Sequence, residues 1–138
     1  MEKRLIKKEA LAGIAKKMAE EFLVWAPVKK EDNVLFVPLE KDVEPFFAYL
    51  NSKNAPKNVF FPHTEVMMKF TRTPEGMALT SEENKADAAV LFGVRPCDAH
   101  SFVLLDMLFD QEKYKDEYYV SKRNNTTVIS LSCVKPPY

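Results

Sequence analysis

Glycine is scarce in this sequence of 138 residues, which contains three glycines and nine prolines. Neither the GxGxxG nor the GxxxxGKS/T pattern occurs, so the two commonest glycine-rich phosphate-binding loops are excluded. The 20 lysines and arginines balance the 20 aspartates and glutamates. A net charge near zero gives no reason to expect nucleic acid or an anionic membrane as a partner.

Long apolar runs are also lacking. No segment approaches the roughly 20 apolar residues of a membrane span, and residues 1–6 have no apolar region of a secretory signal. We therefore expect no membrane span and a cytoplasmic protein. The chain has two cysteines, Cys97 and Cys133. In the cytoplasm they are expected to be thiols or ligands rather than a disulfide.

The first two thirds of the sequence predict one long helix and two hairpins. Apolar residues at helical spacing predict an amphipathic helix over residues 2–22. Strands over residues 22–28 and 34–39 flank a turn-forming segment, which predicts a hairpin. The later segments are predicted as a short helix over residues 41–52, a loop over 53–57, and a second hairpin around a turn at residues 73–76. Trp25, Met67 and Met68 are interpreted as core residues.

The last third has a different pattern. Residues 88–92 form an apolar run that predicts a buried strand. Pro96 stands where a helix would begin, and the mostly apolar residues 100–109 predict that this helix is well buried. Residues 110–123 are predicted to be a surface connection, and residues 126–132 a second buried strand. Strand, helix and strand in this order form a βαβ unit.

These elements predict one α/β (or α+β) domain over residues 1–138. It would have a mixed sheet, a C-terminal βαβ unit, β-hairpins and a long N-terminal helix.

The two cysteines are predicted to meet at one edge of the sheet. Cys97 begins the crossover helix and Cys133 ends the returning strand, and both strands of a parallel βαβ unit end at the edge where such sheets bind ligands. Arg95, Asp98 and His100 crowd the same corner. Buried, inert cysteines are an equally good interpretation. Cys97, Cys133 and His100 make three ligands at most, whereas structural zinc usually has four and cubane iron–sulfur clusters typically take four cysteines.

Two other groups of residues are weaker candidates. His63 and Glu65 are spaced to share one face of a strand, which is commonly just an exposed face. The charged and aromatic residues of segment 116–123 form either a docking surface or, as we favour, a loop whose tyrosines cap the core.

Several segments in order resemble a known family. They are residues 93–100 (GVRPCDAH), residues 116–119 (DEYY), residues 123–125 (RNN) and the strand ending at Cys133. They resemble the N-terminal region of the group that includes the beta subunits of sulfhydrogenases and the A subunits of anaerobic sulfite reductases. Residues 25–28 (WAPV) and 57–65 (KNVFFPHTE) are similar to earlier parts of the same family.

The resemblance implies an iron–sulfur electron-transfer subunit of an anaerobic hydrogenase or sulfite reductase, located in the cytoplasm with other redox subunits as partners. It implies that Cys97 and Cys133 help to bind a [4Fe–4S] cluster completed by cysteines beyond this chain. Arg95, Asp98 and His100 would lie around that cluster. The chain would be the N-terminal part of a longer subunit, and its own two cysteines are not expected to hold a cluster alone.

Two alternatives stay open. One is a thiol- or flavin-dependent oxidoreductase that uses Cys97 as a reactive thiolate with His100 as its base. The other is a cluster-free interaction module that docks through residues 110–123. A non-catalytic electron-transfer subunit is expected over an enzyme acting by itself.

Overall fold

The structure is a computed structural model that describes residues 5–74, 76–81 and 86–133. Its helices and strands are, in chain order, η1 (Lys8–Ala10), α1 (Leu11–Met18), β1 (Leu23–Lys30), β2 (Asn33–Pro38), η2 (Pro56–Val59), β3 (Met68–Thr73), β4 (Gly76–Ser81), β5 (Ala89–Val94), α2 (Pro96–Phe109), α3 (Glu117–Asn124) and β6 (Thr126–Ser130). The predicted mixed α/β architecture, with its hairpins and C-terminal βαβ unit, is confirmed.

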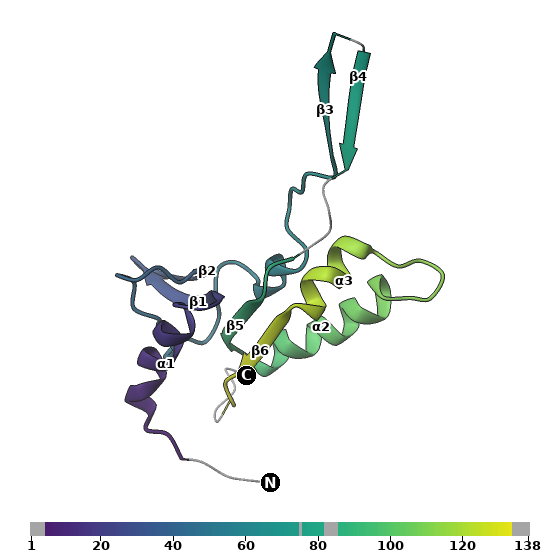
Figure 1. Cartoon of the computed structure of the whole chain (residues 1–138). Coiled ribbons are helices and arrows are strands. Elements are labelled where there is room, and N and C mark those ends of the chain that lie inside the picture. Colours follow the sequence, from purple (N-terminus) through teal and green to yellow (C-terminus); the bar gives the residue numbers. More distant parts are fainter. Residues whose placement is uncertain (1–4, 75, 82–85, 134–138) are drawn as a thin grey trace.

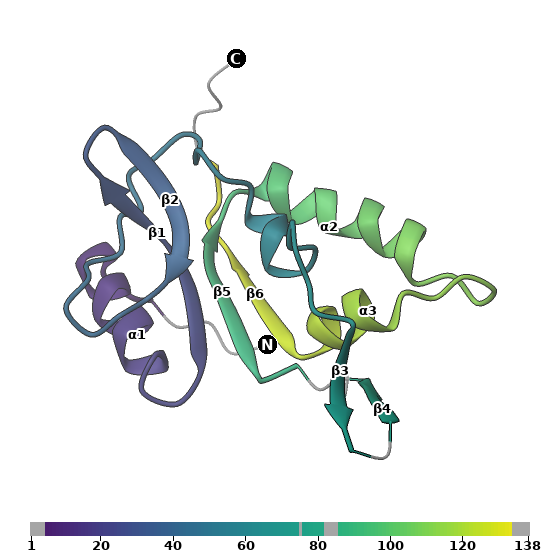
Figure 2. The same ribbon diagram turned by 90° about the horizontal axis from the view of Figure 1, so that it is seen from above.

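Four strands form a mixed sheet in the order β2-β1-β5-β6. The hairpin of β1 and β2 is antiparallel, whereas β1 pairs with β5, and β5 with β6, in parallel. The central strand β5 is buried along its whole length because helices cover both faces of the sheet (Figures 1 and 2). Leu91 packs into the core on the side of α2 and α3, and Val90 and Phe92 pack into the core on the side of α1.

The crossover from β5 to β6 contains two helices. Pro96 is the first residue of α2, as predicted. Residues 110–123 are not merely a surface connection, because they include most of α3, which places Tyr119 and Val120 in the core. The prediction that α2 is well buried is wrong. Phe102 is its one buried residue, and Val103, Leu104, Met107 and Leu108 are exposed. The second parallel strand is likewise less buried than predicted, since Val128 and Ile129 of β6 are half-buried.

The second predicted hairpin forms a projecting arm of β3 and β4, which stands away from the four-stranded sheet (Figure 1). Phe70 pairs with Leu79, and both side chains are exposed. Met67 and Met68 are also exposed, so their interpretation as core residues is wrong. Met68 lies on an arm that no other layer covers within the described residues, and Met67 lies just before that arm.

Two predicted helices differ from the structure. The N-terminal helix is shorter than predicted, because α1 begins at Leu11 after the 3-10 turn η1, and residues 2–4 lie outside the described residues. Residues 41–52 are not helical. Pro45 forms a bridge with Val28, and the Phe46 N–H donates to the Pro27 carbonyl at 2.7 Å. These bonds to β1 hold the segment in an extended path that a helix would not allow.

Among the described residues, no helix combines the length and the apolar composition needed to cross a bilayer.

Candidate functional site

The parallel pairing of β5 and β6 brings the segments that carry both cysteines to one edge of the sheet. Val94 lies opposite Ser130 in the register. The Val94 carbonyl accepts the Leu131 N–H at 2.9 Å and the Ser130 hydroxyl at 3.0 Å. Cys97 and Cys133 each come three residues after these paired positions, and both side chains are exposed. The predicted edge is therefore the one from which both cysteine segments leave the sheet.

The first turn of α2 positions three of the predicted site residues. Arg95 is the N-cap, with an extended backbone (φ −75°, ψ 150°), and Asp98 lies in the first turn, where the helix dipole favours a negative charge. Burial raises the pKa of the Asp98 carboxyl above its usual value. His100 is exposed one turn further on. The edge thus offers an exposed thiol beside a partly desolvated carboxyl.

Tyr49 belongs to this corner and was not predicted. Its hydroxyl donates to the Gly93 carbonyl at 2.8 Å, and the Arg95 guanidinium lies 4.5 Å from the centre of its ring. Burial raises the pKa of Tyr49 well above its usual range. The positive charge of Arg95 opposes this rise, and Asp98 and Cys97 add to it. The Tyr49 ring therefore holds the Arg95 side chain, two residues before Cys97, in place.

Gly93 explains why the segment of Tyr49 can lie so close to β5. Its φ of +86° is favourable only for glycine. A Cβ atom there would stand 2.9 Å from Cε1 of Phe47 and 3.2 Å from Cδ of Pro27. The register of β5 against β6 also shifts between Phe92 and Val94. An isolated glycine within an apolar strand indicates such a bulge or close approach, and this was the available sequence signal.

The edge does not hold a complete metal site within the described residues. No three His, Cys, Asp or Glu side chains there come close enough together to hold a metal ion. A cubane cluster typically needs four cysteine thiolates, and the chain contains two. The residues present therefore do not fit a whole [4Fe–4S] cluster.

The two weaker candidate groups, His63 with Glu65 and the segment 116–123, form contacts within the fold. Glu65 forms an ion pair with Lys122 rather than with His63, which is exposed. In the segment 116–123, Asp116 is the N-cap of α3 and accepts the Tyr119 N–H at 3.0 Å. The Tyr118 hydroxyl donates to the Met67 carbonyl at 3.1 Å. The contacts of Tyr118 and Lys122 attach α3 to the segment that leads into the arm.

Tyr119, Asp106 and Arg123 form a network between α2 and α3. The Tyr119 hydroxyl donates to Asp106 Oδ1 at 2.6 Å, and Arg123 Nε lies 3.1 Å from the same oxygen. Burial, reinforced by the Asp106 hydrogen bond, raises the pKa of Tyr119 well above its usual range. The tyrosine thus caps the core, as we favoured, but from a helix rather than from a loop.

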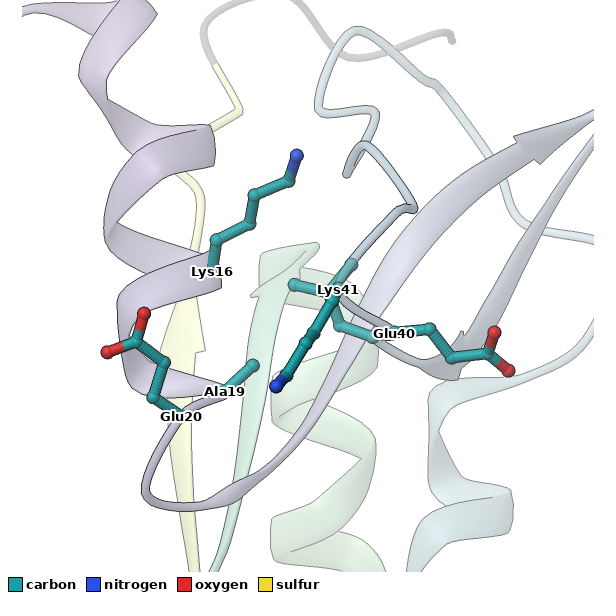
Figure 3. A pocket seen from close by; sticks show the side chains of 6 residues that line it. Lys16, Ala19, Glu20, Glu40 and Lys41 are labelled. Carbon is teal, nitrogen blue, oxygen red and sulfur yellow. The ribbon is translucent and has the colours of Figure 1, made fainter.

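A separate cleft of about 340 Å³ lies between α1 and the segment after β2. Lys16 of α1 and Glu20 of the turn after it line one side of the cleft, Lys41 lines the other, and the carboxyl of Glu40 points away (Figure 3). The cleft lies near the start of β1, because the Leu39 N–H donates to the Val24 carbonyl. Cys97 follows the end of β5, which runs parallel to β1. The cleft is therefore at the opposite end of the sheet from the cysteines.

Comparison with known proteins finds one informative similarity. No family model matches the chain, and no solved structure matches it. The sulfhydrogenase 2 subunit beta of Pyrococcus furiosus is 26% identical to this chain over 115 residues, which is 83% of the chain. The aligned part is 33% of that relative, so the chain spans about a third of the length of the curated protein that it matches. The chain is thus similar to one part of a hydrogenase beta subunit.

Proposed function

We propose that this chain is the N-terminal domain of an iron–sulfur electron-transfer subunit of an anaerobic oxidoreductase, of the hydrogenase or sulfite reductase type. In this proposal Cys97 and Cys133 supply two ligands of a [4Fe–4S] cluster, and residues outside the chain supply the others. The subunit works in the cytoplasm beside other subunits of a redox complex.

The observation that carries the proposal is the placement of the two cysteines. The chain has no other cysteine, and both follow paired positions of adjacent parallel strands, Val94 and Ser130. Both side chains are exposed. An exposed thiol can bind a cluster whose other ligands come from another segment. A structural cysteine is more often buried. The similarity to a hydrogenase beta subunit points to the same kind of protein.

The surroundings of Cys97 suit the binding of a negatively charged iron–sulfur cluster. Cluster potential responds to net charge, hydrogen bonds and solvent exposure. Arg95 stands two residues before Cys97 and is held by Tyr49. Cys97 also lies in the first turn of α2, where backbone N–H groups favour negative ligands.

Anaerobic reconstitution of the full-length product of the gene, with iron and sulfide, tests the proposal. Iron and sulfide content and the electron paramagnetic resonance spectrum would be compared for the wild type, Cys97→Ser and Cys133→Ser. Each cysteine variant should lose the cluster or shift its signal. Ser132→Ala, an exposed neighbour that contributes no thiol, should behave as the wild type. A cluster whose content and spectrum do not change in either cysteine variant would remove both residues as ligands.

A second candidate, a cluster-free interaction module, is favoured by the arm. Phe70 and Met77 are 71% and 76% exposed, and apolar exposure of this kind marks contact surfaces. The same experiment separates the two candidates, because an interaction module would bind no iron in any variant.

A further inference from the structure

An uncovered apolar stripe runs along α2 and begins at Cys97. His100, Leu104, Met107 and Leu108 follow Cys97 at helical spacings of three and four residues, so that they share one face. All five side chains are exposed, and Met107 reaches 67%. The opposite face of α2 carries Phe102, which packs into the core. The helix is therefore apolar on both faces but buried on one.

A helix with apolar residues on both faces normally lies in the interior of a larger protein. The stripe carries no lysine, arginine, aspartate or glutamate. This composition matches the fully buried centre of a protein–protein contact, which is depleted of charged residues and enriched in methionine. It does not match the basic surface that binds an anionic membrane or nucleic acid.

We infer that this face of α2 is the docking surface for the remainder of a longer polypeptide, whose contact surface is apolar and adjoins further cysteines. The inference rests on the proposed function, in which the chain is one domain of a larger subunit. The relative that it matches is about three times as long as the aligned part. β6 ends at the same edge of the sheet as the first turn of α2, so residues 131–133 leave the sheet on the side of Cys97.

A second copy of this chain fits the stripe less well. In an antiparallel pair of α2 helices, the two Cys97 residues would lie at opposite ends, and no new cysteine would come near either of them. A parallel pair would bring both helix N-termini together, where like-signed ends of the dipoles repel. The remainder of the longer polypeptide can cover the stripe and add cysteines at the same time.

Methionine oxidation tests the inference without using the cluster. The chain of residues 1–138 and the full-length gene product, both free of iron, would be treated with dilute hydrogen peroxide, with N-acetylmethionine as the reference for the reagent. Met107 should oxidise about tenfold more slowly in the full-length protein, as expected if the docked state is favoured by roughly ten to one. Leu104→Glu in the full-length protein should restore the faster rate.

Leu79→Glu on the arm is the matched control, because Leu79 and Leu104 are 63% and 56% exposed. It should leave the protection of Met107 intact. Equal Met107 rates in the short and full-length proteins would overturn the inference, and so would a reading frame that ends at residue 138. A dimer of the 138-residue chain that Leu104→Glu dissociates would overturn it by assigning the stripe to a second copy. Protection of Met107 without a Cys97-dependent cluster would defeat the proposed function and leave the docking surface standing.

Discussion

Two regions of the molecule are rich in apolar residues: the corner formed by β5 and α2, and the arm formed by β3 and β4. They differ in how much of their apolar surface is buried. Every residue of β5 is buried, whereas the large apolar residues of the arm are exposed, Phe70 and Leu79 among them. β5 lies between strands on both sides and helices on both faces. The arm has two strands, and a two-stranded hairpin alone is only marginally stable in water.

Apolar residues therefore occupy two kinds of environment in this chain. In the corner they stabilise the fold, and on the arm and on the outer face of α2 they are available for contacts with other protein surfaces. The same substitution should therefore have different effects in the two regions.

The largest difference is expected for phenylalanine. Phe102 is 1% exposed and packs against Phe60 with ring centres 4.9 Å apart. Phe102→Ala should lower the free energy of unfolding by about 4 kcal/mol, because it leaves a cavity in the core. Phe70→Ala on the arm should change it by less than about 0.5 kcal/mol. Urea denaturation measures both values, and a similar loss in both variants would contradict the comparison.

The glycines provide the next contrast. Gly93→Ala should lower the free energy of unfolding by about 3 kcal/mol, because it combines a positive φ with a clash against the Phe47 ring. Gly76 also has a positive φ, but no atom lies within 4 Å of the Cβ that Gly76→Ala would add. It should distort the arm and leave the global transition nearly unchanged. Thermal unfolding followed by circular dichroism separates the two. An unchanged transition in Gly93→Ala would show that the corner tolerates a side chain there.

Adjacent tyrosines allow a smaller contrast. Tyr119→Phe removes a partly buried hydrogen bond to the Asp106 carboxylate and should lower the free energy of unfolding by about 2 kcal/mol. Tyr118→Phe removes an exposed hydrogen bond to the base of the arm and should lower it by less than about 0.5 kcal/mol. Chemical denaturation of the two variants gives the comparison. A larger loss for Tyr118→Phe would mean that the arm contributes to the core.

The smallest effect is expected from Asp98 and depends on pH. Burial raises its pKa in the folded state above 3.8, so the folded protein holds this proton more tightly than the unfolded chain. The resulting stabilisation is present below the unfolded pKa and is lost as the pH rises through the folded pKa. The wild type should therefore lose stability relative to Asp98→Asn as the pH rises above the unfolded pKa of about 3.8 and through the higher pKa of the folded state. The opposite trend would show that the helix dipole outweighs burial.

Local patterns predicted much of the fold. The turn-forming segment between two strand-like runs predicted β1 and β2, a continuous apolar run predicted β5, and Pro96 marked the first residue of α2. The register of β5 and β6 confirmed the parallel βαβ unit. These features depend on neighbouring residues, so one sequence is sufficient to find them.

Features that depend on distant contacts were missed. The aromatic residues of segment 41–52 suggested a helix, but hydrogen bonds to β1 hold this segment extended. Tyr49 therefore could not be assigned to the cysteine corner until its contact with Gly93 was known. Apolar residues on α2 and at Met67 and Met68 were interpreted as core, because the sequence does not show which apolar faces another layer covers.

The central claim is that Cys97 and Cys133 share one site. Dibromobimane tests it in the 138-residue chain, because this reagent becomes strongly fluorescent only after both of its bromomethyl groups have alkylated thiols. The account predicts fluorescent, intramolecularly bridged protein that is absent in Cys97→Ser and in Cys133→Ser. Complete alkylation of both cysteines by separate reagent molecules, without a bridged product, would contradict it.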